Sequence, residues 1–249
     1  MKIAVCLKRV PDTTAKIVIG ASRTAIDEAG VKFVPNPYDE FALEAAIALK
    51  EQAGAGETTA IAVGTDASQE TLRTALAMGI DRAVLLQSAG SADGFAVARA
   101  LAAELKAGGY DLVLFGKLAV DDYNHQVGVM VAELLEVPCI SAAAKLTLTG
   151  TAILAEREIE GGVEVMACSL PAVVTCDKGL NNPRLPSLKG IMAAKKKPLD
   201  TKPVTLEAAS FEVTSLELPA ERQAGRIVGE GADAVPALIA LLRNEAKVL

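Results

Sequence analysis

The chain has 249 residues, of which 51% are hydrophobic and 22% are charged, enough to bury the core of one large α/β domain or of two small ones. The formal net charge of −6 argues against nucleic acid as the main partner. Aromatic residues make up only 3% and Trp is absent, so we expect a core of Ala, Val, Leu and Ile. Such a core suits helices packed closely on a parallel sheet.

Several kinds of segment and site are not indicated. The start, MKIAVCLKRV, places Arg9 directly after a short apolar run, which is not the pattern of a signal peptide. No stretch approaches ~18 uninterrupted apolar residues, so we expect no membrane insertion. The cysteines are scattered without CxxC spacing or a neighbouring His, which predicts no metal site and a reduced protein of the cytoplasm, or of a compartment like the mitochondrial matrix. They are Cys6, Cys139, Cys168 and Cys176.

Strand-like and helix-like segments alternate over the first half of the chain. Short β-branched or aliphatic runs predict buried strands, and apolar residues three or four positions apart predict amphipathic helices. In chain order we predict a strand at 3–7, a helix at 39–53, a strand at 59–63, a helix at 68–78, a strand at 83–86, a helix at 94–106, a strand at 111–115 and a helix at 126–135. This alternation predicts an α/β fold with parallel strands and right-handed crossovers.

The pattern changes after Pro138. Two strand-like runs, 152–160 and 163–170, flank Gly161-Gly162, which is a two-residue hairpin signal. We then predict a buried strand at 172–175, a loop at 178–202, an extended arm at 205–226 and a helical segment at 232–248. Residues 1–204 are therefore expected to form the α/β domain, and residues 205–249 a C-terminal arm with a helix.

Three segments are expected at the carboxyl ends of strands, where parallel sheets bind ligands. They are 6–12, 36–39 and 116–128, and the last reads GKLAVDDYNHQVG. It leaves a strand through Gly116, which lets the backbone approach a ligand, and enters a helix whose free N–H groups suit phosphate. An ordinary loop with a polar helix cap explains the same spacing equally well. Neither GxGxxG nor GxxxxGK[ST] is present.

Catalytic constellations are missing from the sequence. His125 is the sole histidine and has no accompanying nucleophile motif or metal-ligand cluster, so we expect a loop residue near a ligand. Cys6 follows a strand and is expected to be a small buried thiol. We therefore predict no catalytic residues.

Residues 181–197, NNPRLPSLKGIMAAKKK, place apolar side chains in a loop interrupted by Pro and Gly. Leu185, Leu188, Ile191 and Met192 are followed by three lysines. Exposed apolar residues ringed by charge indicate a docking surface. The alternative is that the apolar side chains fold back on the core while the lysines are merely solvated.

Taken together, these segments resemble the electron-transfer flavoprotein β-subunit family over nearly the whole chain. The matching stretches are VCLKRVPD, VPNPYDEFALEAA, QETLRTALAMGIDRA, GKLAVDDYNHQVG, EREIEGGVE, LPAVVT, NNPRLPSLKGIMAAKKKPL and AGRIV. The resemblance implies an electron-carrier subunit with a three-layer fold like that of adenine-nucleotide hydrolases and universal stress proteins. It also implies a heterodimer, in which a larger α subunit holds most of the FAD and is embraced by the arm of the β subunit.

The same resemblance implies that the β subunit itself binds AMP. The implied nucleotide site comprises Cys6, Asn36, Pro37, Tyr38, Asp39, Val63, Gly116, Lys117, Leu118, Ala119, Val120, Asp121, Asp122, Tyr123, Asn124, His125, Gln126 and Val127. In bifurcating members of the family a second FAD replaces AMP. Thr13 in VPDTT favours that group, whereas the sequence around 122–124 favours AMP, which we adopt.

The implied recognition loop for flavin dehydrogenases, such as acyl-CoA dehydrogenases, runs from 184 to 197. Its partner-binding residues would be Arg184, Leu185, Leu188, Ile191, Met192, Lys195, Lys196 and Lys197, with Leu188 as the anchor. Electrons would then pass to a membrane-bound quinone reductase. Two alternatives come from other classes: a stand-alone nucleotide-binding stress-type protein, and a purely structural assembly protein.

Overall fold

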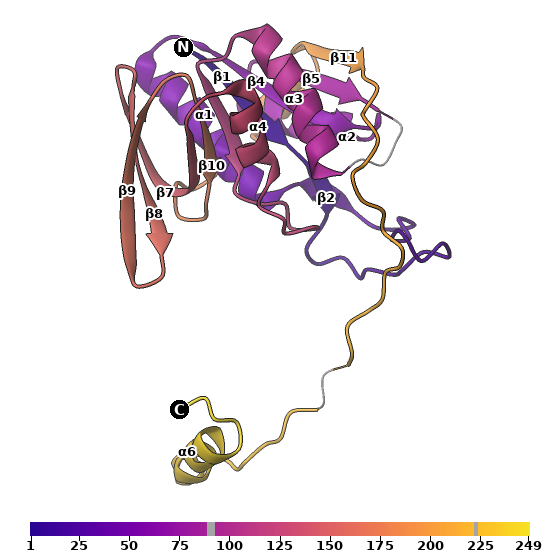
Figure 1. The fold of residues 1–249 in the computed structure, drawn as a ribbon, viewed down its shortest axis with the longest axis vertical. Coiled ribbons are helices and arrows are strands. Elements are labelled where there is room, and N and C mark those ends of the chain that lie inside the picture. The colour runs from indigo at the N-terminus through magenta and orange to yellow at the C-terminus, as the bar shows by residue number, and fades with distance from the viewer. Residues whose placement is uncertain (89–92, 222–223) are drawn as a thin grey trace.

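The computed structural model describes residues 1–88, 93–221 and 224–249. Its main sheet has nine strands in the order β11-β5-β4-β1-β6-β10-β7-β8-β9 (Figure 1). The strands are β1 (Lys2–Leu7), β4 (Glu57–Gly64), β5 (Arg82–Gln87), β6 (Leu112–Gly116), β7 (Cys139–Thr149), β8 (Ala152–Ile159), β9 (Gly162–Ser169), β10 (Ala172–Cys176) and β11 (Leu199–Pro203). Pairing is parallel from β11 to β7 and antiparallel from β7 to β9, which confirms the predicted α/β class and hairpin.

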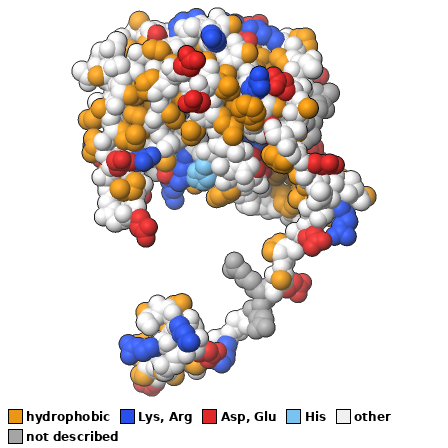
Figure 2. All heavy atoms as spheres, in the orientation of Figure 1, with side chains coloured by type: hydrophobic (Ala, Val, Ile, Leu, Met, Phe, Trp, Pro, Cys, Tyr) orange, Lys and Arg blue, Asp and Glu red, His pale blue; other side chains and the backbone are white. Residues whose placement is uncertain are grey.

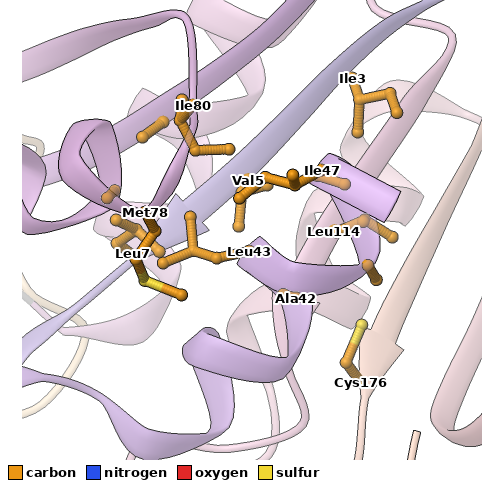
Figure 3. Close-up of a cluster of buried hydrophobic side chains, with 14 of the residues drawn as sticks. Ile3, Val5, Leu7, Ala42, Leu43, Ile47, Met78, Ile80, Leu114 and Cys176 are labelled. Atoms are coloured by element: carbon orange, nitrogen blue, oxygen red, sulfur yellow. The ribbon is translucent and has the colours of Figure 1, made fainter. Parts of the chain in front are cut away.

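Helices cover both faces of the sheet. On one face, α1 (Pro37–Ala53) and α2 (Ser68–Met78) share a core with Ile3, Val5 and Leu7 of β1 (Figure 3). On the other face, α3 (Gly94–Gly108) and α4 (Val127–Leu135) pack with Ala4 and Cys6. Successive strand residues point to opposite faces, so a central strand buried on both must be an unbroken apolar run. This is why β1 reads IAVCL after Lys2.

Five elements were not predicted. Strand β7 follows Pro138 and joins the hairpin to the parallel sheet, but its Ala- and Ser-rich first half carries little alternation. The prediction of a loop over 178–202 is wrong in part, because it contains helix α5 (Leu188–Ala194) and strand β11. Strand β11 is an edge strand with mostly exposed side chains, so its sequence has no apolar pattern. The small antiparallel pair β2 (Arg9–Pro11) and β3 (Phe33–Pro35) was missed as well.

The C-terminal segment leaves the body of the molecule. The arm first lies against it, through ion pairs from Arg99 to Glu207 and from Arg23 to Glu217, at 2.9 and 2.8 Å. Helix α6 (Val235–Asn244), preceded by the short helix η1 (Ala232–Ala234), stands apart (Figure 1). Figure 2 shows that this segment carries side chains of both charges. Residues 222–223 of the predicted arm lie outside the described residues, and the division at 204/205 stays a prediction.

None of the helices in the described ranges has the length and apolarity that crossing a bilayer requires.

Candidate functional site

Strands β1 and β6 are neighbours in the sheet, and the strand order runs outward from them in opposite directions. Strands β4 and β5 lie beyond β1, whereas β10 and β7 lie beyond β6. Open α/β sheets bind ligands at such a reversal, outside the carboxyl ends of the strands. A cavity opens there, with about 720 Å³ of empty space including the solvent in its mouth.

The structure brings most of the predicted nucleotide-site residues to this cavity. Those that line it are Cys6, Asn36, Asp39, Val63, Gly116, Lys117, Leu118, Ala119, Asp122, Asn124, His125, Gln126 and Val127. Predicted residues that do not line it are Pro37, Tyr38, Val120, Asp121 and Tyr123. Pro37 instead occupies the first turn of α1, where its fixed φ suits a helix start.

Six further residues line the cavity and were absent from the predicted site. They are Leu7, Lys8, Val97, Leu101, Phe115 and Gly128. Leu7, Lys8 and Gly128 fall inside the strand-end segments 6–12 and 116–128, so the sequence did indicate that they lie where parallel sheets bind ligands. Val97 and Leu101 are one turn apart on α3 and share one side of the helix, but this spacing is equally typical of core residues.

The loop that follows β6 is compact. A Cβ atom on Gly116 would lie 2.4 Å from Asp39 Oδ1 and 2.7 Å from the carbonyl carbon of Tyr38, so only glycine fits there. Tyr123 and His125 both adopt left-handed backbone conformations, with φ of 56° and 55°. The Tyr123 N–H donates to the carbonyl of Ala119 at 2.9 Å. The loop therefore turns back on itself before α4 begins.

Both lysines of the cavity are paired with carboxylates. Lys8 Nζ lies 2.9 Å from Asp121 and 2.8 Å from Asp122, and Lys117 Nζ lies 2.7 Å from Asp177. An anion would instead meet the N-terminus of α4. The N-cap residue of that helix, Gln126, makes no side-chain capping hydrogen bond, and the first turn has no acidic residue. The positive end of the helix dipole therefore faces the cavity without a capping side chain.

The buried groups of the cavity favour binding over chemistry. Burial, followed by the nearby Asp39 carboxyl, raises the pKa of the Cys6 thiol well above its usual value, so the thiol stays protonated and weakly nucleophilic. The cavity offers an apolar wall from Val97, Leu101 and Phe115, polar side chains at Asn124 and Gln126, and a helix N-terminus. This combination suits a ligand that carries both an apolar ring and an anionic group.

A second surface surrounds α5. Leu185, Leu188, Ile191 and Met192 are 90%, 79%, 46% and 60% exposed, so the alternative in which they fold back on the core is wrong. Two other predicted partner-binding residues anchor this loop to the body. Arg184 forms paired hydrogen bonds to Glu44 and Glu51 of α1, at 2.7–3.0 Å.

Lys197 anchors the other end of the loop. Its Nζ donates to the carbonyl of Leu76 at 2.9 Å and to that of Ile80, near the C-terminal end of α2. Arg73 of α2 donates to the carbonyls of Ala194 and Lys197, at 2.7 and 2.9 Å. Lys195 and Lys196 remain exposed. The apolar side chains are thus presented from a loop that is fixed at both ends.

Comparison with known proteins agrees with the motifs. Residues 23–207 match the family model for the electron transfer flavoprotein domain. The electron transfer flavoprotein subunit beta of Bacillus subtilis is 43% identical over 260 residues, covering all of both chains. The subunit beta of Syntrophomonas wolfei is 39% identical, covering 100% of this chain and 98% of its own. The human subunit beta is 41% identical over 233 residues, covering 90% of this chain and 91% of its own. The chain therefore belongs to the electron transfer flavoprotein family, as a β-type electron-carrier subunit.

Proposed function

We propose that the chain binds AMP in the cavity between β1 and β6 and works in a heterodimer with an electron transfer flavoprotein α subunit. The α subunit would hold most of the FAD, which supplies the redox chemistry when bound. The complex would take electrons from flavin dehydrogenases, such as the acyl-CoA dehydrogenases of fatty acid oxidation. It would pass them to a quinone reductase, in the cytoplasm or in a mitochondrial matrix.

The observation that carries the nucleotide proposal is the cavity at the reversal of strand order. It joins an apolar wall to the uncapped N-terminus of α4. Val97, Leu101 and Phe115 would receive the purine, and the N–H groups that begin α4 would receive the phosphate. Asn124 and Gln126 would serve the ribose hydroxyls. The cavity lysines are already paired, so the backbone must supply most of the charge complementarity to the phosphate.

The docking proposal rests on the exposed side chains around α5. Four apolar residues stand in solvent on a loop that Arg184 and Lys197 fix to two helices. A preorganised apolar patch loses little conformational entropy when it binds. Leu188, which begins α5 and is 79% exposed, would be the central contact with the dehydrogenase.

The first experiment identifies the nucleotides. The chain is co-expressed with its α subunit, the purified complex is denatured, and every released nucleotide is identified by chromatography and mass. One FAD and one AMP per heterodimer would support the proposal. Two FAD and no AMP would support a second FAD in this cavity, as in bifurcating members. A chain that elutes alone from gel filtration, and captures no flavin-bearing subunit, would instead be a stand-alone nucleotide-binding protein.

A further inference from the structure

Two buried polar residues at the start of α1 use their side chains on the protein itself. Asn36 is 1% exposed and Asp39 is 5% exposed, and both line the cavity. Both residues were predicted to contact the nucleotide directly. A different role for Asp39 rests on the proposed nucleotide function, which it deepens. We infer that Asp39 is instead a positioning residue, which bridges the ends of β1 and β6 and so sets the shape of the nucleotide site.

The Asp39 carboxylate joins the two strands on either side of the reversal. Its Oδ2 accepts a hydrogen bond from the N–H of Lys8, the residue after β1, at 2.8 Å. Its Oδ1 accepts one from the N–H of Gly116, the last residue of β6, at 3.1 Å. A single buried carboxylate therefore joins the end of β1 to the end of β6. The cavity opens between the same two ends.

Asn36 extends the bridge into the loop after β6. Its Nδ2 donates to Asp39 Oδ1 at 2.8 Å and to the carbonyl of Leu118 at 2.7 Å. Its Oδ1 accepts from the N–H of Val120 at 3.1 Å. Its own N–H donates to the carbonyl of Lys8 at 2.9 Å. The pair therefore holds the loop that carries the cavity residues from Lys117 onward.

The hydrogen-bond donors around Asp39 explain why the bridge needs a carboxylate. Three N–H groups converge on its two oxygens, and a carboxylate accepts all three, whereas an amide would turn its own N–H groups toward at least one of them. Gly116 is the matching feature on β6, because any Cβ there would lie 2.4 Å from Asp39 Oδ1. Burial raises the pKa of Asp39 to about 7, against the hydrogen bonds from Asn36, Lys8 and Gly116, so the carboxyl is about half ionised at pH 7 and mostly ionised at pH 8.

The test uses the complete chain in complex with its α subunit, stripped of nucleotide, at pH 8. The affinity for added AMP is measured by equilibrium dialysis for the native protein, Asp39→Ala, Asp39→Asn and Leu72→Ala. Leu72 is fully buried in α2 and does not line the cavity, so its variant controls for lost stability. Amide hydrogen exchange of residues 116–120 is measured on the same samples, because it reports the loop without any ligand.

We expect Asp39→Ala to weaken AMP binding about 10- to 100-fold, the loss that follows when residues that orient metal ligands are replaced. Exchange of the Gly116 and Val120 amides should quicken. Asp39→Asn, which keeps one acceptor oxygen, should fall between Asp39→Ala and the native protein. Leu72→Ala should unfold at a lower temperature with unchanged AMP affinity and unchanged exchange at 116–120.

Native AMP affinity and slow exchange in both Asp39 variants would overturn the inference. So would an equal loss of affinity in Leu72→Ala. If the native complex binds FAD and no AMP, the same comparison is made with FAD. If it binds neither, the proposed function fails, and the exchange of residues 116–120 still decides whether Asp39 positions the loop. If Asp39→Ala does not fold, Asp39→Asn must show both effects for the inference to stand.

Discussion

Replacing Leu188 by Ala removes most of an exposed side chain from the centre of the proposed docking surface. In the free chain Leu188 is 79% exposed, so the truncation leaves no cavity and should not change stability. Burial of a whole Leu side chain is worth about 1.5–3 kcal/mol. Ala keeps the Cβ and part of the leucine is already covered, so the loss on docking should be about 1–2 kcal/mol. That corresponds to an affinity roughly 5- to 30-fold lower.

The assay is reduction of the heterodimer by a flavin dehydrogenase at a series of heterodimer concentrations. Leu188→Ala should raise KM by that factor and leave kcat and the FAD content unchanged. Leu154→Ala is the matched control, since Leu154 is 48% exposed on β8, away from α5. A Leu188 variant that performs like the native protein, or a Leu154 variant that is equally impaired, would refute the assignment of this surface.

Three other perturbations test the site and its supports. Arg184→Ala leaves Glu44, whose side chain is 11% exposed, without its partner. This should cost about 1–2 kcal/mol of unfolding free energy, since the pair is only partly buried, and loosening the loop should raise KM for the dehydrogenase. An unchanged melting temperature and KM would contradict the anchoring role. Gly116→Ala forces a Cβ to within 2.4 Å of Asp39 Oδ1, so thermal denaturation should show a loss of about 1–3 kcal/mol, and the AMP content should fall. Unchanged stability and unchanged AMP content would show that the strand ends can separate. Asp39 also predicts a pH effect, because its pKa is about 7 in the folded chain, well above the 3.8 of an unperturbed Asp. Between these pH values the native state holds more protons than the unfolded state, so the free energy of unfolding falls as pH rises. From pH 5 to 7 the fall should be about 2 kcal/mol, because the slope of about 1.4 kcal/mol per unit flattens as the pH approaches the folded pKa. The free energy of urea unfolding of Asp39→Asn should not show this fall. An identical dependence of the unfolding free energy on pH in Asp39→Asn and in the native protein would refute the predicted pH effect.

The sequence by itself determined the layers of the fold. The unbroken apolar run of β1 required burial on both faces, and the alternation with helical periods required crossovers, so the parallel sheet followed from local patterns. The Gly161-Gly162 signal located the hairpin to within one residue, because a two-residue turn is a local feature: Ile159 pairs with Gly162, so the turn residues are Glu160 and Gly161. The ordered motifs identified the family, which the full-length relatives confirm.

Only the tertiary structure decided which polar side chains bond to the protein itself and which line the cavity. Asp39 and Gly116 are 77 residues apart, and Arg184 and Glu44 are 140 apart, so no local pattern could pair them. Lys197 looked like its two neighbours in a run of lysines, yet it bonds to carbonyls near the end of α2. Strand β11 has no apolar pattern because its side chains are exposed, and it is defined by backbone pairing with β5 alone. Local periodicity reports which faces are buried, whereas hydrogen-bond partners distant in the chain are set only when the strands and helices have packed.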